Sequence, residues 1–138
     1  MKRFLPLICV LAGCATQTPT QPFSDEDMLS AASALTKVAI AVDGATRYGG
    51  LPDSATDDEL LALATADDRE LLRPFTNFRV VARRQGAHSE VLLCTSDLTN
   101  ALIEDAGCSA PSDVHHWKTL PLPPCAFVLN LEDVCQGR

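Results

Sequence analysis

The sequence predicts an α+β domain in which N-terminal helices pack on a small, largely antiparallel sheet, stabilised by two disulfides. Three observations lead to this fold class. Apolar residues recur at helical spacing through residues 24–73, and from residue 78 the apolar period changes to two. The second half of the chain also holds four cysteines: Cys94, Cys108, Cys125 and Cys135. A chain of 138 residues can bury one core, so we expect a single domain over residues 24–138.

The first helix is predicted to begin after Ser24. This residue is a favourable N-cap, and Asp27 stands three residues later at the capping-box position. Apolar residues recur at helical spacing from there to Val42. The helix is expected to end either at Gly44 or at the glycine pair 49–50.

Two shorter helices are expected before the sheet. Thr56 and Glu59 form a capping-box pattern that begins the second helix, and a third helix over 66–73 is ended by Pro74. Acidic residues gather in the first turns of all three helices, where carboxylates complement the helix dipole. Their spacing does not match a calcium-binding loop, so we interpret them as helix-stabilising residues.

A β-hairpin is predicted next, with strands over about 78–83 and 88–94 and a turn at Gln85-Gly86. Side chains alternate between the two faces of such a hairpin. The face toward the core is expected to carry Phe78, Val80, Ala82, Ser89, Val91 and Leu93.

The opposite face of this hairpin is the first possible binding surface. It carries Arg79, Arg83, His88 and Glu90, and the predicted turn places Arg83 opposite His88 and Val81 opposite Glu90. Arginines on such a face can hold a carboxylate or a phosphate through two hydrogen bonds. The favoured alternative is a solvated face on which Glu90 lies diagonally between two arginines as a cross-strand ion pair, because surface charge pairs are common.

The last third of the chain leaves one element open. Residues 97–106 fit a helix that Ser96 caps and Gly107 ends, and the same segment fits a strand over 101–104. The helix is slightly favoured. Residues 125–131 are mostly apolar and predict a further strand.

The N-terminus has the three parts of a secretory signal. Lys2 and Arg3 supply the positive region, residues 4–11 are apolar, and small residues follow. The run Leu11-Ala12-Gly13-Cys14 resembles the lipobox of bacterial lipoproteins.

This resemblance implies a lipid-anchored protein of the bacterial envelope. Residues 1–13 would be removed as a signal peptide, Cys14 would carry acyl chains such as palmitate, and residues 14–23 would be a flexible tether. Several acyl chains anchor a protein permanently, since each buried methylene contributes ~0.8 kcal/mol. Ala15, where the family's inner-membrane proteins commonly have Asp, favours the outer membrane and its periplasmic side.

In an oxidising compartment, we expect the four cysteines of the domain to form two disulfides. They lack the Cys-x-x-Cys pairs that are typical of structural zinc sites. A helix over 97–106 would favour Cys94 with Cys135 and Cys108 with Cys125, because it would hold Cys94 and Cys108 too far apart to bridge. A strand in the same place would favour Cys94 with Cys108 instead.

A second possible site is the proline-rich segment 109–124, which contains His115, His116 and Trp117. The two histidines could bind zinc or copper together with His88, but adjacent histidines usually diverge. We favour a simpler role, in which Trp117 buries a cleft beneath the proline-rich loop.

These observations predict a non-enzymatic protein with no cofactor. The chain has no nucleophile elbow, no zinc-protease motif and no phosphate-binding glycine loop, and its net charge of −7 argues against nucleic acid as a partner. The leading hypothesis is an envelope-anchored accessory or binding module that contacts an envelope protein or a cell-wall component. The alternatives are a periplasmic inhibitor of a cell-wall hydrolase, acting through a stiff loop at 115–124, and a histidine-based metal-binding protein.

Overall fold

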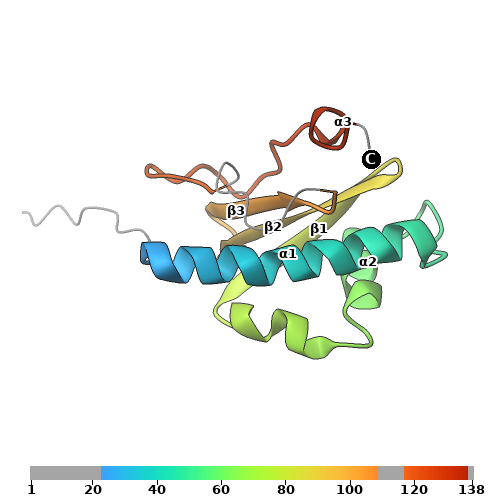
Figure 1. Cartoon of the computed structure of the whole chain (residues 1–138), viewed down its shortest axis with the longest axis horizontal. Helices are drawn as coiled ribbons and strands as arrows, with labels where there is room; N and C mark the ends of the chain where they lie inside the picture. The colour runs from blue at the N-terminus through green and yellow to red at the C-terminus, as the bar shows by residue number, and fades with distance from the viewer. Residues whose placement is uncertain (1–22, 109–116, 137–138) are drawn as a thin grey trace, which may run out of the picture.

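The computed structural model describes residues 23–108 and 117–136, and it confirms the predicted α+β class. One long helix lies across one face of a three-stranded antiparallel sheet with the order β1-β2-β3 (Figure 1). The elements in chain order are α1 (Asp25–Tyr48), α2 (Asp57–Ala64), the 3₁₀ helix η1 (Arg69–Phe75), β1 (Phe78–Gln85), β2 (His88–Thr95), β3 (Ala101–Ala106) and α3 (Leu131–Val134).

The predicted helix starts are confirmed at α1 and α2. The Ser24 hydroxyl accepts a hydrogen bond from the Asp27 N–H, and Thr56 and Glu59 form the full capping box. Of the two expected ends of α1, the later one is right, because the helix runs through Gly44 and Gly49 is its C-cap. A glycine in a helix interior costs only about 1 kcal/mol, which the buried face of this long helix outweighs.

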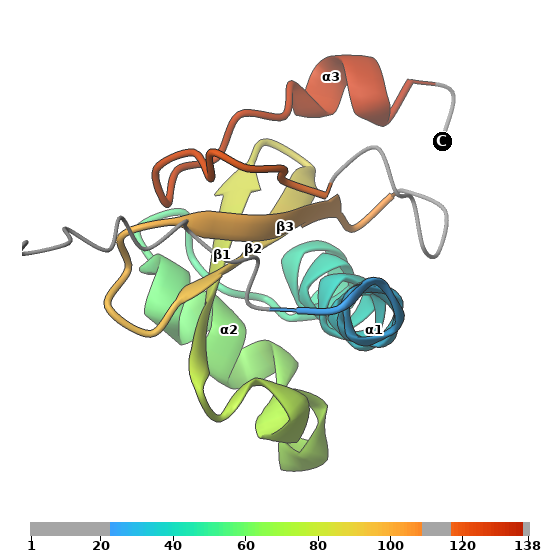
Figure 2. The same cartoon turned by 90° about the vertical axis from the view of Figure 1, so that its left-hand side faces the viewer.

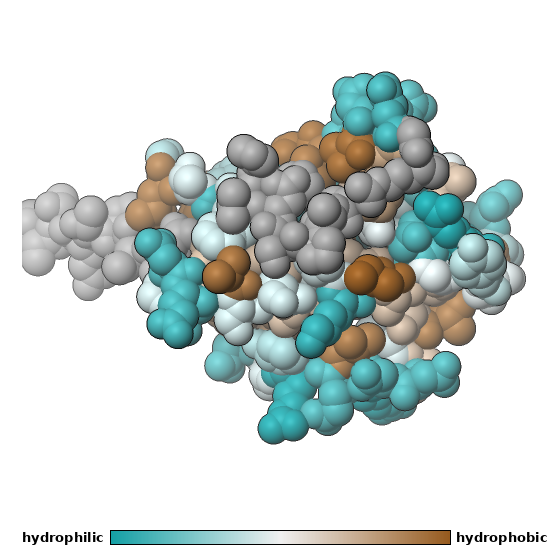
Figure 3. Space-filling view, in the orientation of Figure 1, coloured by the Kyte–Doolittle hydropathy of each residue, from teal (hydrophilic) through white to brown (hydrophobic). Residues whose placement is uncertain are grey.

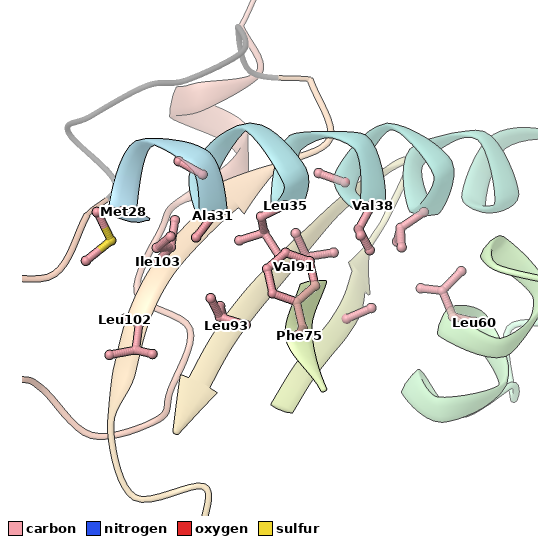
Figure 4. Packing of buried hydrophobic residues seen from close by; sticks show 14 residues of the cluster. Met28, Ala31, Leu35, Val38, Leu60, Phe75, Val91, Leu93, Leu102 and Ile103 are labelled. Atoms are coloured by element: carbon pink, nitrogen blue, oxygen red, sulfur yellow. The ribbon is translucent and has the colours of Figure 1, made fainter. Parts of the chain in front are cut away.

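Helix α1 supplies one side of the main core. It is long and apolar enough to cross a membrane by length and composition, but 44% of its most apolar window is buried within the domain. Its buried face packs on the sheet around Leu35 and Val38, with Val91 and Phe75 opposite (Figure 4). On its outer side, apolar side chains are separated by hydrophilic ones (Figure 3). Packing against the sheet therefore accounts for the apolar character of α1.

The hairpin exists, but its predicted register is wrong by two residues. The turn lies at Gly86 and the next residue, so that Gln85 pairs with His88 and Arg83 pairs with Glu90. Gly86 has a φ of +62°, which glycine adopts without strain and which fixes the turn one position later than expected. A shift of two residues preserves the two faces, so the predicted core face is correct.

The favoured helix over 97–106 is wrong, and the strand alternative is right. All six residues of β3 are buried, which a strand covered on both faces allows and a helix with one buried stripe does not. The predicted strand over 125–131 is also wrong, because residues 126–130 form no regular element and Leu131 begins α3.

Both expected disulfide patterns are wrong. Cys94 pairs with Cys125 and Cys108 pairs with Cys135, with Cα atoms 5.8 and 5.6 Å apart. Cys94 lies near the turn between β2 and β3, whereas Cys108 follows the far end of β3, so the hairpin holds these two cysteines apart. The C-terminal part of the chain returns across the sheet, so that Cys125 reaches Cys94 near one end of β3 and Cys135 reaches Cys108 near the other.

This returning segment, residues 125–135, is called the C-terminal strap below. It lies on the side of the sheet opposite α1 and ends in α3 (Figure 2). Its Phe127 packs against the cluster of Leu92, Cys94 and Ala101, and its Leu131 packs with the end of β3. The sheet is therefore covered on both faces.

Candidate functional site

The two edges of the sheet differ in how they are paired. Along β3, the Lys118 N–H donates to the Leu102 carbonyl and the Ala101 N–H donates to the Pro123 carbonyl, both at 2.9 Å. Strand β1 pairs with β2 on one side, and within residues 23–108 and 117–136 no strand pairs with its other side. Among the described residues, the outer edge of β1 is therefore not paired with another strand.

A groove of about 520 Å³ runs beside this edge. Helix α2 contributes Leu61, η1 contributes Leu72 and Phe75, and the turn before β3 contributes Leu98. The remaining lining residues are Asp58 and four consecutive residues of β1, Phe78, Arg79, Val80 and Val81. Val80 and Val81 point to opposite faces of the sheet, so a groove that touches both follows the strand edge itself.

The groove combines apolar walls with charged residues. Arg79 is exposed, and no ion pair engages it within the described part of the chain. The other arginines of β1 are engaged: Arg84 donates to the Pro52 carbonyl at 2.8 Å, and Arg83 pairs with Glu90. Of these three arginines, Arg79 is thus the one placed to receive an anionic group in the groove.

Only part of the predicted polar face of the hairpin is exposed to solvent. Arg79, Arg83, His88 and Glu90 do lie on one face of the hairpin, as expected from the alternation. Arg83 is covered by the Phe127 ring, 4.6 Å from the ring centroid, and its Nε donates to a Glu90 carboxylate that is fully buried. A cross-strand ion pair is therefore present, but the expected solvated face is wrong. Glu90 pairs with Arg83 directly opposite it rather than lying diagonally between two arginines, and it is buried beneath the strap.

Sequence reasoning missed the role of a buried acid, Glu104 on β3. It accepts hydrogen bonds from Lys118 Nζ at 2.8 Å and from the N–H groups of Val128 and Leu129 at 2.8 and 3.0 Å. The signal was the pair of acidic residues Glu104 and Asp105 in the otherwise apolar segment 101–106, which is unusual for a strand that is buried on both faces.

The two buried glutamates have opposite pKa shifts. Burial raises the pKa of Glu90 to about 7, against the lowering effect of Arg83. Burial also acts to raise the pKa of Glu104, but the hydrogen bonds from Leu129, Lys118 and Val128 outweigh it and lower that pKa. At neutral pH, Glu104 is therefore ionised while a substantial part of Glu90 holds a proton.

Only part of the second predicted site lies within the described residues. Trp117 packs against the main core and bridges to Ile103, while residues 109–116 of the loop beneath which it was predicted to lie are outside the described residues. His115 and His116 lie outside the described residues, as does Cys14, and His88 is partly buried at the hairpin turn. Among the described residues, no three His, Cys, Asp or Glu side chains form a group suited to a metal ion.

Comparisons with protein-family models, curated proteins and solved structures find no match to this chain.

Proposed function

We propose that this protein is a lipid-anchored, non-enzymatic binding module of the bacterial envelope. In this proposal, the domain captures an extended segment of a partner protein along the outer edge of β1. The observation that carries it is the combination of an unpaired strand edge with an adjoining groove of about 520 Å³. Extended peptides commonly bind in this way, by adding a strand to an exposed sheet edge.

Each part of the groove has a task in this binding mode. The backbone of β1 would hydrogen-bond the bound segment, which gives affinity without regard to sequence. Alternate side chains of the segment would enter the space between Leu61, Phe75 and Leu98. Arg79 would pair with a carboxylate, so the groove favours a segment with both apolar and acidic residues.

A second copy of the same chain fits this edge poorly. Strand β1 contains Arg79, Arg83 and Arg84 and no acidic residue. An antiparallel pairing of two full β1 strands would place Arg79 opposite Arg84, and like charges directly opposite are destabilising. The charge of β1 therefore favours an acidic partner segment over self-association.

The lipid anchor would set where capture takes place. The lipobox resemblance at Leu11-Ala12-Gly13-Cys14 supports attachment to an envelope membrane, with the periplasmic side of the outer membrane as the proposed location. The two disulfide pairs are consistent with folding in an oxidising compartment. A short tether raises the local concentration of the domain near membrane proteins.

The test is partner capture from envelopes by the acylated protein and by two charge-reversed variants. Arg79→Glu changes the groove, and Lys37→Glu makes the same change on the exposed side of α1. We expect Arg79→Glu to weaken capture about tenfold, which is about 1.4 kcal/mol, and Lys37→Glu to leave it unchanged. Equal capture by both variants would contradict the assignment of the groove.

A further inference from the structure

We propose that Glu90 and Glu104 form a buried proton-binding pair whose ionisation controls how firmly the C-terminal strap is held on the sheet. This pair lies within the fold and would act whether or not a partner is bound in the groove. Its role follows from the position of the two carboxyls, from the bonds that Glu104 makes to the strap, and from the disulfides at the two ends of the strap.

The two carboxyls are close neighbours beneath the strap. Glu90 pairs with Ala106 and Glu104 pairs with Leu92, so the two glutamates are diagonal neighbours on the same face of β2 and β3. Both side chains are fully buried. Two negative charges at such a site would repel each other with little screening from water.

Glu104 holds the middle of the strap, and the disulfides hold its ends. One oxygen of Glu104 accepts the N–H groups of both Val128 and Leu129, and the other accepts Lys118 Nζ. Cys125 is tied to β2, and Cys135 is tied to the residue that follows β3 by two positions. Release from Glu104 would thus let residues 126–134 move while both anchors stay in place.

The described groups around Glu90 satisfy only one of its two carboxyl oxygens. From β1, Arg83 bonds one oxygen of Glu90, while the other oxygen, Oε2, is buried with no hydrogen-bond partner among the described residues. On β2, His88 is the titratable neighbour along the same face, and from the segment before the strap Lys118 is already engaged by Glu104. The carboxylates of α3, Glu132 and Asp133, are exposed to solvent.

We therefore expect Glu90 to be protonated while the strap is bound to the sheet. A neutral Glu90 leaves a single anion, Glu104, to bind the strap amides and Lys118. Loss of the proton would place a second anion beside it, and water entering beneath the strap would relieve the repulsion. We expect Phe127 to leave Arg83 when this happens, because both belong to the same covered surface.

Amide exchange of the isotope-labelled lipoprotein in detergent micelles tests this directly. Protection factors for Val128 and Leu129, corrected for intrinsic exchange, should fall about tenfold between pH 6 and pH 8, as linkage to a group titrating near neutrality requires. The amides of Leu35 and Val38 in α1 should keep constant protection over the same range. A flat profile at Val128 and Leu129 would overturn the proposal.

Two further measurements keep the test decisive. In Glu90→Gln, which is neutral at all pH values, the protection of the strap amides should no longer depend on pH; an unchanged fall would overturn the role of Glu90. If this variant does not fold, ¹³C titration of the Glu90 carboxyl in the unmodified protein replaces it. The carboxyl and the strap amides should then share one midpoint, and clearly different midpoints would contradict the proposal.

Discussion

Arg83 and Glu90 face each other directly across β1 and β2, and the strap closes over both of them. The Glu90 carboxylate is fully buried, while the Arg83 side chain retains 34% of its exposure. Glu90 is therefore the buried partner of the pair, and the partly exposed Arg83 connects it to the molecular surface. This asymmetry determines what happens when one partner is removed.

Replacing Arg83 with Met should destabilise the fold more at high pH than at low pH. Without the guanidinium, Glu90 is a buried carboxyl that has lost its main cationic partner. Breaking a fully buried pair costs about 3–5 kcal/mol, and the partial exposure of Arg83 should reduce this to about 2 kcal/mol. Urea unfolding at pH 5 and pH 8 measures the difference. An equal loss at both pH values would show that the charge of Glu90 is not the cause.

Removal of either disulfide should destabilise the domain by roughly 3 kcal/mol, since the two bridges span similar sequence separations of 31 and 27 residues. The effects on the strap should differ. Cys94→Ala with Cys125→Ala frees the end next to Phe127, whereas Cys108→Ala with Cys135→Ala frees α3. Limited proteolysis with mass spectrometry would locate the cleavage sites. Cleavage at the same places in both double variants would contradict this division.

The combined contribution of Glu90 and Glu104 to the free energy of unfolding should be highest in mildly acidic solution. The raised pKa of Glu90 means that the folded protein holds a proton between pH 4.5 and about 7 that the unfolded chain has lost, so stability falls as pH rises through this window. The lowered pKa of Glu104 acts in the opposite direction, because its contribution is lost as pH falls below 4.5.

Chemical denaturation across this pH range checks both slopes. The contribution of Glu90 is roughly 3 kcal/mol at most, at 1.36 kcal/mol for each pKa unit. Glu90→Gln should remove the decline toward pH 7 and leave the decline at acidic pH. A variant that retains the full upper decline would assign it to another group.

The sequence predicted the features that depend on local chemistry. Helix starts at Ser24 and Thr56 follow from capping residues, and the core face of the hairpin follows from the alternation of apolar and polar side chains. The register error at Gln85 did not disturb the faces because it amounted to two residues. These features are set by neighbours within a few positions along the chain.

The features that failed depend on tertiary arrangement. Residues 101–106 have no periodicity of their own, since a strand covered on both faces is apolar throughout except where a buried network supplies a partner. Glu104 finds that partner in Lys118 and in the strap, which lie 14 to 25 residues away. The disulfide pattern could not be derived before the direction of β3 and the return of the chain over the sheet were known.

The groove was also beyond sequence reasoning, except for one residue. Arg79 was singled out as part of a polar face, but its partners there were expected to be Arg83, His88 and Glu90. Arg79 does lie on that face, and the structure also places it beside apolar residues of α2, η1 and the turn at Leu98. No sequence pattern in α2 or η1 indicates that these two helices lie beside the edge of β1.

Site-specific photocrosslinking in intact envelopes would show whether a partner binds beside β1. A photoreactive amino acid would replace Leu98 in the groove or, as the matched control, Ile40 on the outer side of α1; both are exposed apolar side chains, at 45% and 57%. We expect a discrete crosslinked partner at position 98, lost on Arg79→Glu, and no such product at position 40. Crosslinks of equal yield at both positions, or at position 40 alone, would contradict a binding site beside β1.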